Sequence, residues 1–448
     1  MKKLFQYILM AVAVVVTASC SNESDEALQP ANNGTLQFVV SNFPTFGEGT
    51  QTRVIGTQDE GKTAWENGDQ IIITLTSERF GEQTTAITYD GTNWGTEVSL
   101  SYLENEIPTV SAVYAPCYEV TVEGVKQLRS GMQLGMCEYL EADCEIQNGT
   151  INISFADALR TYSRLRIAGL ENQTLTVTTT DFTPAGATSV ATEPYTLTTD
   201  EKGNAYLYGT FAEGATVKVK KGDVTLTDYT FTFTTELIQS YALDARPVID
   251  GTLGGKAEAT EDDITALVEQ LKEYVDNGIT TIIVPGSEPA LIEMDSWTNT
   301  AIGEAIYRLS GSDDYDENNP YNGKIDLILQ DVTEIVDQEF YSAWALNSIT
   351  LPKVIKIGDE AFHRTWFLKT ITFESVLTEV NETSGVMFAQ VGKEVDGCNL
   401  FINCGQMKEN SVPTPDLTTN TWKFKFENEF KSITLTHTGE CDECKANQ

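Results

Sequence analysis

The residue types that most often carry catalysis or bind metals are sparse in this chain. It has two histidines among 448 residues, and neither His363 nor His437 lies beside a serine or cysteine nucleophile motif. The sequence has no zinc-binding His-Glu-x-x-His and no phosphate-binding glycine loop. The acidic stretch 313–319 departs from the EF-hand calcium-binding pattern. Asn319 stands where the pattern requires glycine, and Ile325 stands where it requires the bidentate glutamate. We therefore expect a non-catalytic protein with no cofactor and no metal site.

The eight cysteines suggest a few local bonds rather than a dense disulfide framework. Cys398 and Cys404 flank a predicted strand and are candidates for a local disulfide. Cys441 and Cys444 form a CxxC pair in a polar tail, 436–448, without the following helix of a redox site or the second pair of a zinc site. For them a local disulfide, an intermolecular disulfide and no bond all stay open. If Cys20 is set aside, an odd number of cysteines remains, so at least one is unpaired within the monomer or pairs between chains.

Cys20 follows an export signal. Lys2 and Lys3 precede an apolar run, 8–16, which is too short to span a bilayer as a mature helix and is typical of a segment that is removed. The small residues 17–19 before Cys20 resemble the lipobox of bacterial lipoproteins, in which the cysteine receives the acyl chains; Thr17 departs from the aliphatic residue usual there. The resemblance implies a signal peptide over 1–19 and a lipid on Cys20 that anchors the chain in a membrane. The acidic tether 20–34 begins like the surface-export signal of Bacteroidetes lipoproteins, which implies the outer membrane and cell surface.

The net charge of −37 and pI near 4.2 argue against nucleic acid as a partner, because nucleic-acid binding needs a basic face. The same charge argues against adsorption to anionic lipid, so attachment to a membrane depends on the acyl chains. No later apolar stretch approaches eighteen residues, and we expect no transmembrane helix. The length predicts two or three domains.

Residues 35–245 have the pattern of a mainly β domain. Short runs rich in Thr, Val, Ile and Tyr alternate with Gly, Asn and Asp, and no amphipathic helix interrupts them. In the segment 229–233 the aromatic rings fall on one face and the threonines on the other, as in a half-buried antiparallel strand.

Several motifs of this half resemble fimbrillin-like proteins of Bacteroidetes. They are Thr52-Arg53, the segments 65–73 (Trp-Glu-Asn-Gly-Asp into an isoleucine run) and 89–94, the Tyr-x-Pro segment 113–116, the join 155–167 and the closing strand 239–243. The resemblance implies two transthyretin-like β-sandwiches, split near residue 165. It also makes Arg53 a candidate processing site, because in assembling fimbrillins an arginine-specific protease removes an N-terminal strand and opens a groove for the next subunit.

Residues 246–259 are rich in Gly and Pro and are predicted to be a linker. Thr260 then caps a predicted helix, 261–277, with acids in its first turn, an apolar stripe at helical spacing, and Gly278 after its end. We expect this helix to cover one end of the domain that follows, 260–435.

An internal repeat of 22 residues runs through the second half. Leu327, Ile349 and Ile371 keep this step, as do Leu329, Leu351 and Phe373, and the pairs 340/362, 344/366 and 346/368. A repeat of this length with one Leu-x-Leu strand per turn is the leucine-rich-repeat signature. The sequence of residues 357–371 resembles the BspA-like subclass of leucine-rich repeats, which is found on bacterial and protist surfaces. About three turns are visible, so both ends should need covers, with 399–403 and 422–435 as candidates for the second.

Alternate residues of each repeat strand should face solvent and form a candidate binding surface. Its members are Asp326, Ile328, Gln330, Ser348, Thr350, Thr370, Thr372 and Glu374. Trp344 and Trp366 either extend it as an aromatic ladder for a glycan or peptide, or fill the turn between the strand and the return segment. The chain is thus expected to be an adhesin or an accessory or tip subunit of a fimbrium, with fimbrial subunits or host or bacterial surface proteins or glycans as partners. The alternative is a glycan-binding lipoprotein of a nutrient-uptake system.

Overall fold

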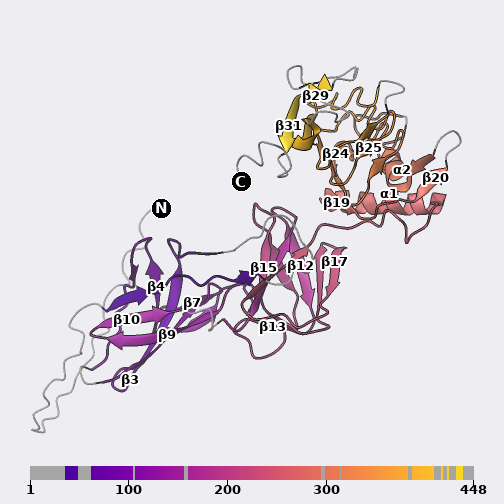
Figure 1. Ribbon diagram of the computed structural model, residues 1–448. Helices are drawn as coiled ribbons and strands as arrows, with labels where there is room; N and C mark the ends of the chain where they lie inside the picture. Colours follow the sequence, from indigo (N-terminus) through magenta and orange to yellow (C-terminus); the bar gives the residue numbers. More distant parts are fainter. Residues whose placement is uncertain are drawn as a thin grey trace, which may run out of the picture.

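The computed structural model describes residues 36–48, 62–103, 106–155, 160–293, 298–312, 314–381, 386–407, 415–416, 421–422 and 430–436. The predicted signal peptide and tether, Cys20, Arg53, Cys441 and Cys444 lie outside these ranges. Within them the chain is mainly β, with two α-helices. Three bodies follow one another along the chain (Figure 1). Neither described helix has the length and apolar character needed to cross a bilayer.

The first body is a closed barrel. Its strands lie in the order β1-β10-β9-β6-β3-β4-β5: β1 (Gln37–Val40), β3 (Gln70–Ser77), β4 (Gly81–Tyr89), β5 (Trp94–Gly95), β6 (Thr109–Tyr114), β9 (Leu140–Gln147) and β10 (Thr150–Ser154). A hairpin of β7 (Tyr118–Val120) and β8 (Lys126–Leu128) stands beside it. The first body is therefore a barrel and not the predicted sandwich. The two-residue strand β5 pairs with both β4 and β1 and so closes the sheet, although it covers only the end of the β4 edge.

The second body has two sheets whose apolar faces share one core. One has the order β13 (Phe182–Pro184), β15 (Ala205–Phe211), β11 (Ser163–Ala168), β18 (Gln239–Asp244) and β2 (Gly47–Glu48). The other has the order β14 (Tyr195–Thr198), β12 (Thr174–Thr179), β16 (Thr216–Lys221) and β17 (Val224–Thr230). Leucine and valine of β12 point inward and its first threonines outward, the alternation expected of a strand with one solvated face.

The segment 37–48 joins the first two bodies. Its strand β1 pairs in parallel with β10 of the barrel, and β2 pairs in parallel with β18 of the second body; β2 is the short indigo arrow beside β15 in Figure 1. Between them the guanidinium of Arg160 lies 3.7 Å from the ring of Phe46 and binds the buried carboxylate of Glu138 at 3.1 Å. One short segment thus contributes a strand to each body.

The third body is built on a six-stranded parallel sheet. Its order is β19 (Thr281–Val284), β22 (Ile325–Leu329), β24 (Leu346–Leu351), β26 (Thr370–Phe373), β28 (Asn399–Asn403) and β31 (Ser432–Thr436). Leu327 pairs with Ile349, and Ile349 with Ile371, so the predicted 22-residue register is confirmed. A second parallel sheet joins the turns through β23 (Glu334–Ile335), β25 (Lys356–Ile357) and β27 (Glu379–Val380). The short strands β29 (Pro415–Asp416) and β30 (Thr421–Trp422) and the 3₁₀ turn Cys404–Met407 lie near the end.

Two helices pack against each other at the start of this body. The first, α1 (Glu261–Asp276), confirms the helix prediction: Thr260 and Asp263 form a capping box, and the apolar stripe is buried. The second, α2 (Ala301–Leu309), was not predicted and follows the hairpin of β20 (Leu291–Glu293) and β21 (Thr298–Thr300).

Residues 246–259 are not the linker with few contacts that their composition predicts. Ile249 is buried, its amide donates to the carbonyl of Ile283 (2.8 Å), and the amide of Ile283 donates to the carbonyl of Pro247 (3.0 Å). Nearby, the Nζ of Lys221 in β16 donates to the carbonyl of Gly278 just after α1 (3.0 Å). Because the apolar residues of the second and third bodies form one continuous cluster, these two bodies share a core.

Candidate contact surface

The solvent-facing side of the six-stranded parallel sheet carries the predicted binding residues in three rows. In parallel strands that pair in register, residues at the same level stand side by side, about 4.8 Å apart from strand to strand. The inward residues at the intervening positions, such as Leu327, Ile349 and Ile371, are fully buried and hold the strands in place. The sequence pattern and the packing therefore fix which side chains face outward.

The first row is polar, and several of its side chains hydrogen-bond one another. It consists of Asp326, Ser348, Thr370, Asn399 and Ser432 in successive strands. The Oδ1 of Asp326 accepts from the hydroxyl of Ser348 (2.6 Å) and from the amide of Asn347 (2.7 Å). The hydroxyl of Ser432 donates to Asn399 Oδ1 (2.7 Å). These bonds order the row but leave fewer groups for a partner.

The middle row is uncharged, and its members are half-exposed apart from Thr434, which is exposed. It runs through Ile328, Thr350, Thr372, Phe401 and Thr434. No described group hydrogen-bonds the hydroxyls of Thr350 and Thr372, which stand between the apolar side chains of Ile328 and Phe401. Unengaged hydroxyls between apolar neighbours can accept and donate to a partner without first breaking an internal bond.

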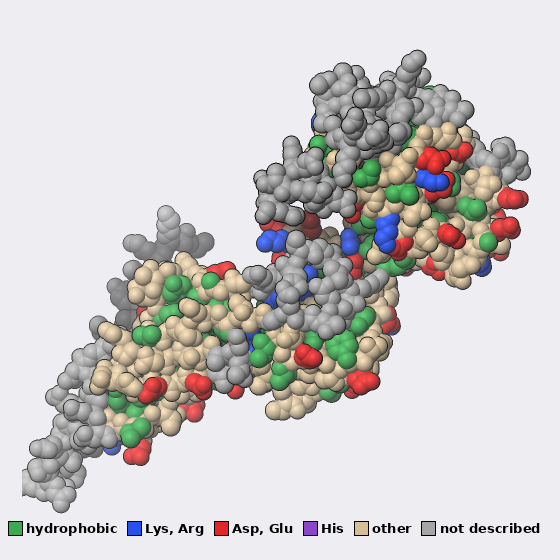
Figure 2. Space-filling model, in the orientation of Figure 1, with side chains coloured by type: hydrophobic (Ala, Val, Ile, Leu, Met, Phe, Trp, Pro, Cys, Tyr) green, Lys and Arg blue, Asp and Glu red, His purple; other side chains and the backbone are tan. Residues whose placement is uncertain are grey.

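The third row is exposed at its two predicted members, of which one is an acid. Gln330 and Glu374 both face solvent here. Beside them the Nζ of Lys353 lies 2.5 Å from Asp331, and this ion pair lowers the pKa of the Asp331 carboxyl. On the face shown in Figure 2, acidic side chains are spread over all three bodies, in keeping with the net charge. The described residues hold no cluster of three or more His, Cys, Asp or Glu side chains that could bind a metal ion.

Trp344 and Trp366 do not belong to this surface. Trp344 is fully buried and Trp366 is 9% exposed, and their rings stack with centroids 5.2 Å apart. Tyr315 contacts both rings edge-on, and Lys393 lies 4.4 Å from the centroid of Trp366. The tryptophans thus fill the segments that lead into β24 and β26, and the binding-ladder alternative is wrong for Trp344.

The predicted disulfide between Cys398 and Cys404 is also wrong. Both are thiols in the structure, and the extended strand β28 separates them. Five strand residues span roughly 17 Å, whereas the Cα atoms of a disulfide lie within about 7 Å. The disulfide joins Cys117 to Cys137 instead, at the base of the β7–β8 hairpin. Burial raises the pKa of the Cys398 thiol to about 12, so it stays protonated.

Part of the middle row was not predicted from the sequence. Phe401 and Thr434 continue it, but the turns that lead to β28 and β31 are longer than 22 residues and break the repeat. The usable signal was the alternation of 399–403, which predicted a strand but not its parallel register. Cys20, Arg53, Cys441 and Cys444 lie outside the described residues, and their predicted roles stay predictions.

Comparison with known proteins gives little. No protein-family model matches the chain, and no curated protein does. Among solved structures, a "putative cell adhesion protein" from Bacteroides fragilis aligns with 47% of this chain and 92% of its own, at 10% identity and a TM-score of 0.23. A TM-score this low does not establish a shared fold, so the likeness supports no conclusion about this chain.

Proposed function

We propose that the chain is a non-catalytic, lipid-anchored protein of the cell surface that acts as an adhesin or as an accessory or tip subunit of a fimbrium. In this proposal the third body makes the contact, and the first two bodies carry it outward from the membrane. The observation that carries the proposal is the middle row of the parallel sheet, with free hydroxyls between half-exposed apolar side chains.

The proposal extends to the folds of the second and third bodies. The 22-residue step and the parallel register of β22, β24 and β26 support a short leucine-rich-repeat solenoid of the BspA-like kind. The two sheets of the second body, with shared core, support a transthyretin-like sandwich of the fimbrillin-like kind. The glycan-uptake alternative would need an exposed aromatic platform, but Trp344 and Trp366 are buried.

Processing at Arg53 would have a defined consequence. A cut after Arg53 would separate β1 and β2 from the rest of the chain, and with them one strand of the barrel and one edge strand of the second body. The barrel would then have an open slot between β10 and β5. An open slot of this kind is a surface to which an extended segment can add.

The anchor is tested by replacing Cys20 with Ala. Acylation would hold the chain in the membrane through buried acyl chains at about 0.8 kcal/mol per CH₂. We expect the wild-type protein in the membrane fraction and Cys20→Ala in the soluble fraction. Equal membrane association of the two proteins would refute the lipid anchor.

Adhesion is tested with beads coated with the purified chain on a layer of epithelial cells. In the double variant Thr350→Lys, Thr372→Lys, two charges interrupt the middle row, and we expect bead attachment to fall at least about tenfold, as for loss of a central interface contact. The matched control is Thr176→Lys, Thr196→Lys, a pair of exposed threonines that are also cross-strand neighbours, in the second body. Equal attachment of both variants would exclude the row, and no attachment of the wild type would refute the adhesin.

A further inference from the structure

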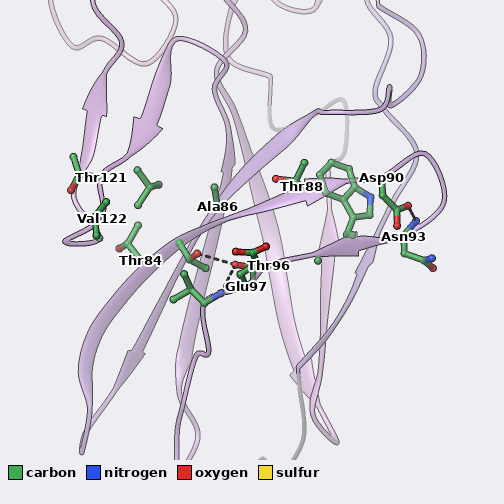
Figure 3. Close-up of a pocket in the computed structure, with 15 residues that line it drawn as sticks. Thr84, Ala86, Thr88, Asp90, Asn93, Thr96, Glu97, Thr121 and Val122 are labelled. Atoms are coloured by element: carbon green, nitrogen blue, oxygen red, sulfur yellow. Dashed lines mark hydrogen bonds between the residues drawn. The ribbon is translucent and has the colours of Figure 1, made fainter. Parts of the chain in front are cut away.

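A second candidate site lies on the barrel, far along the chain from the parallel sheet. It is a cavity of about 790 Å³, a size typical of ligand sites. Its floor is strand β4, and its walls are residues 96–98 on one side and the tip of the β7–β8 hairpin on the other (Figure 3). Nothing in the proposed adhesive role uses it.

The floor of this cavity is an unpaired stretch of strand edge. β4 pairs along its whole length with β3 on one side, but on the other it pairs with β5 only at Thr88 and Tyr89. After Gly95 the chain turns away: the amide of Val98 donates to the hydroxyl of Thr96 (3.1 Å), which also bonds the hydroxyl of Thr85 (3.1 Å). The ladder therefore stops before it reaches Ala86.

The direction of the backbone groups at this edge follows from the alternation of an antiparallel ladder. The amide of Tyr89 donates to the carbonyl of Asp69 toward β3, so the odd-numbered residues of β4 bond β3 and the even-numbered ones face the other way. The carbonyl of Thr84 indeed points to the hairpin tip, where it lies 3.2 Å from the place a Cβ would take on Gly124. Ala86, between Thr84 and Thr88, faces the cavity, and no described backbone group pairs with its amide or carbonyl.

The walls add apolar side chains and negative charge. Val122 at the hairpin tip is fully exposed and Val98 opposite is 56% exposed. The lining contains the carboxylates of Asp90 and Glu97 and neither lysine nor arginine. Asp90 is held in place by the backbone amides of Asn93 (2.7 Å) and Thr92 (2.8 Å), and these bonds lower the pKa of its carboxyl, so the charge persists at neutral pH.

We propose that this cavity binds an extended segment of a partner polypeptide that alternates basic and apolar residues and adds to the free edge of β4 at Ala86. The backbone of the segment pairs with the amide and carbonyl of Ala86, which a strand edge offers to any extended chain. Its apolar side chains contact Val98 and Val122, and its cations face Asp90 and Glu97. The commitment to a basic segment rests on the charge of the lining.

The probe is a fluorescein-labelled peptide in which lysine alternates with valine, titrated with the full chain and followed by fluorescence anisotropy. Its comparison peptide is N-methylated at every residue, which keeps the side chains and charges but removes the backbone donors. We expect about tenfold weaker binding of the methylated peptide, the factor that corresponds to 1.4 kcal/mol and is typical of a lost hydrogen bond. Hydrogen exchange should slow at residues 84–88 in the presence of the unmodified peptide.

Two variants test whether the peptide binds in this cavity. Val122→Lys puts a cation on the cavity wall at a fully exposed position, where it should leave folding intact, and we expect peptide binding to weaken about 2- to 5-fold, as for one exposed charge pair. Val190→Lys, at a 49% exposed valine of the second body, is the matched control and should have no effect.

Three results would overturn the proposal. They are equal binding of the two peptides, equal effects of the two variants, and an absence of binding up to the solubility limit of the unmodified peptide. A fourth concerns the class of ligand: if maltoheptaose slows exchange at residues 84–88 and the peptide does not, the cavity binds a saccharide and the assignment to a polypeptide is wrong.

Discussion

Glu339 should make the stability of the third body depend on pH. Its side chain is 1% exposed and lies at the start of α2, where the hydroxyl of Thr300 donates to Oε1 (2.8 Å) and the amide of Val336 to Oε2 (3.0 Å). Burial raises the pKa of this carboxyl from 4.5 to about 7, against the effect of the two hydrogen bonds. In the next two turns the corresponding residues are the fully buried Ala361 and Met387, so the carboxyl is peculiar to the turn that meets α2.

The sign of the effect follows from where the proton is held. Between pH 4.5 and about 7 the folded chain keeps a proton on Glu339 that the unfolded chain has released, so stability falls as the pH rises through this window. Below it the group is neutral in both states and costs nothing. Above it the buried carboxylate costs about 3 kcal/mol, the order of magnitude that corresponds to this rise at about 1.4 kcal/mol per pKa unit.

The assay compares wild type with Glu339→Gln, which keeps the shape and cannot ionise. A protein of three bodies need not unfold in one step, so the free energy of opening is measured locally, by hydrogen exchange in α2. The measurements are made at pH 5 and pH 8 and corrected for the intrinsic exchange rates at each pH. The advantage of Glu339→Gln over wild type should grow by about 3 kcal/mol from pH 5 to pH 8. Glu374→Gln, at an exposed carboxylate of the same body, should give no such growth. A difference between Glu339→Gln and wild type that is constant with pH would refute the reasoning.

Three further predictions concern packing. Leu351→Ala, at a fully buried position of β24, should lower the free energy of unfolding in urea titrations by about 2–5 kcal/mol. Thr350→Ala, one residue away, should lower it by less than about 0.5 kcal/mol, and equal small losses in the two variants would contradict the register. Replacing Cys117 and Cys137 with serine opens a loop with a sequence separation of 20 and should cost the barrel about 3 kcal/mol, to be checked against the wild type with and without reductant. Lys221→Ala removes a cation from the end of α1, which has no basic residue in its own last turn, and should speed amide exchange there without changing exchange in the barrel.

The sequence predicted the elements whose signals are local or periodic. The N-cap at Thr260 depends on only a few neighbouring residues, and the structure has it. The pairing of Leu351 with Phe373 follows from a constant step of 22 residues, which transfers the position of one strand to the next. Even the burial of Trp344 is consistent with this step, because a residue repeated in each turn stacks on its own counterpart.

The missed features depend on contacts between distant segments. Barrel closure requires the short β5 to meet β1 on one side and β4 on the other, and no period links these strands. The disulfide between Cys117 and Cys137 could not be predicted from the spacing of the cysteines, because that spacing is compatible with many pairings. Gly and Pro over 246–259 suggested a linker, but composition does not reveal that Val248 pairs with Ile283 at the edge of the parallel sheet.

That pairing bears on how so short a repeat is stabilised. Three turns of 22 residues are near the minimum for a stable solenoid, and their end strands would expose unpaired backbone. Here β19 extends the parallel sheet at one end, while β28 and β31 extend it at the other. Residues 247–249 bond the outer edge of β19, and Lys221 of the second body reaches the end of α1. Under the proposed adhesive role, a partner bound at Thr350 or Thr372 would be linked to the second body through one continuous core.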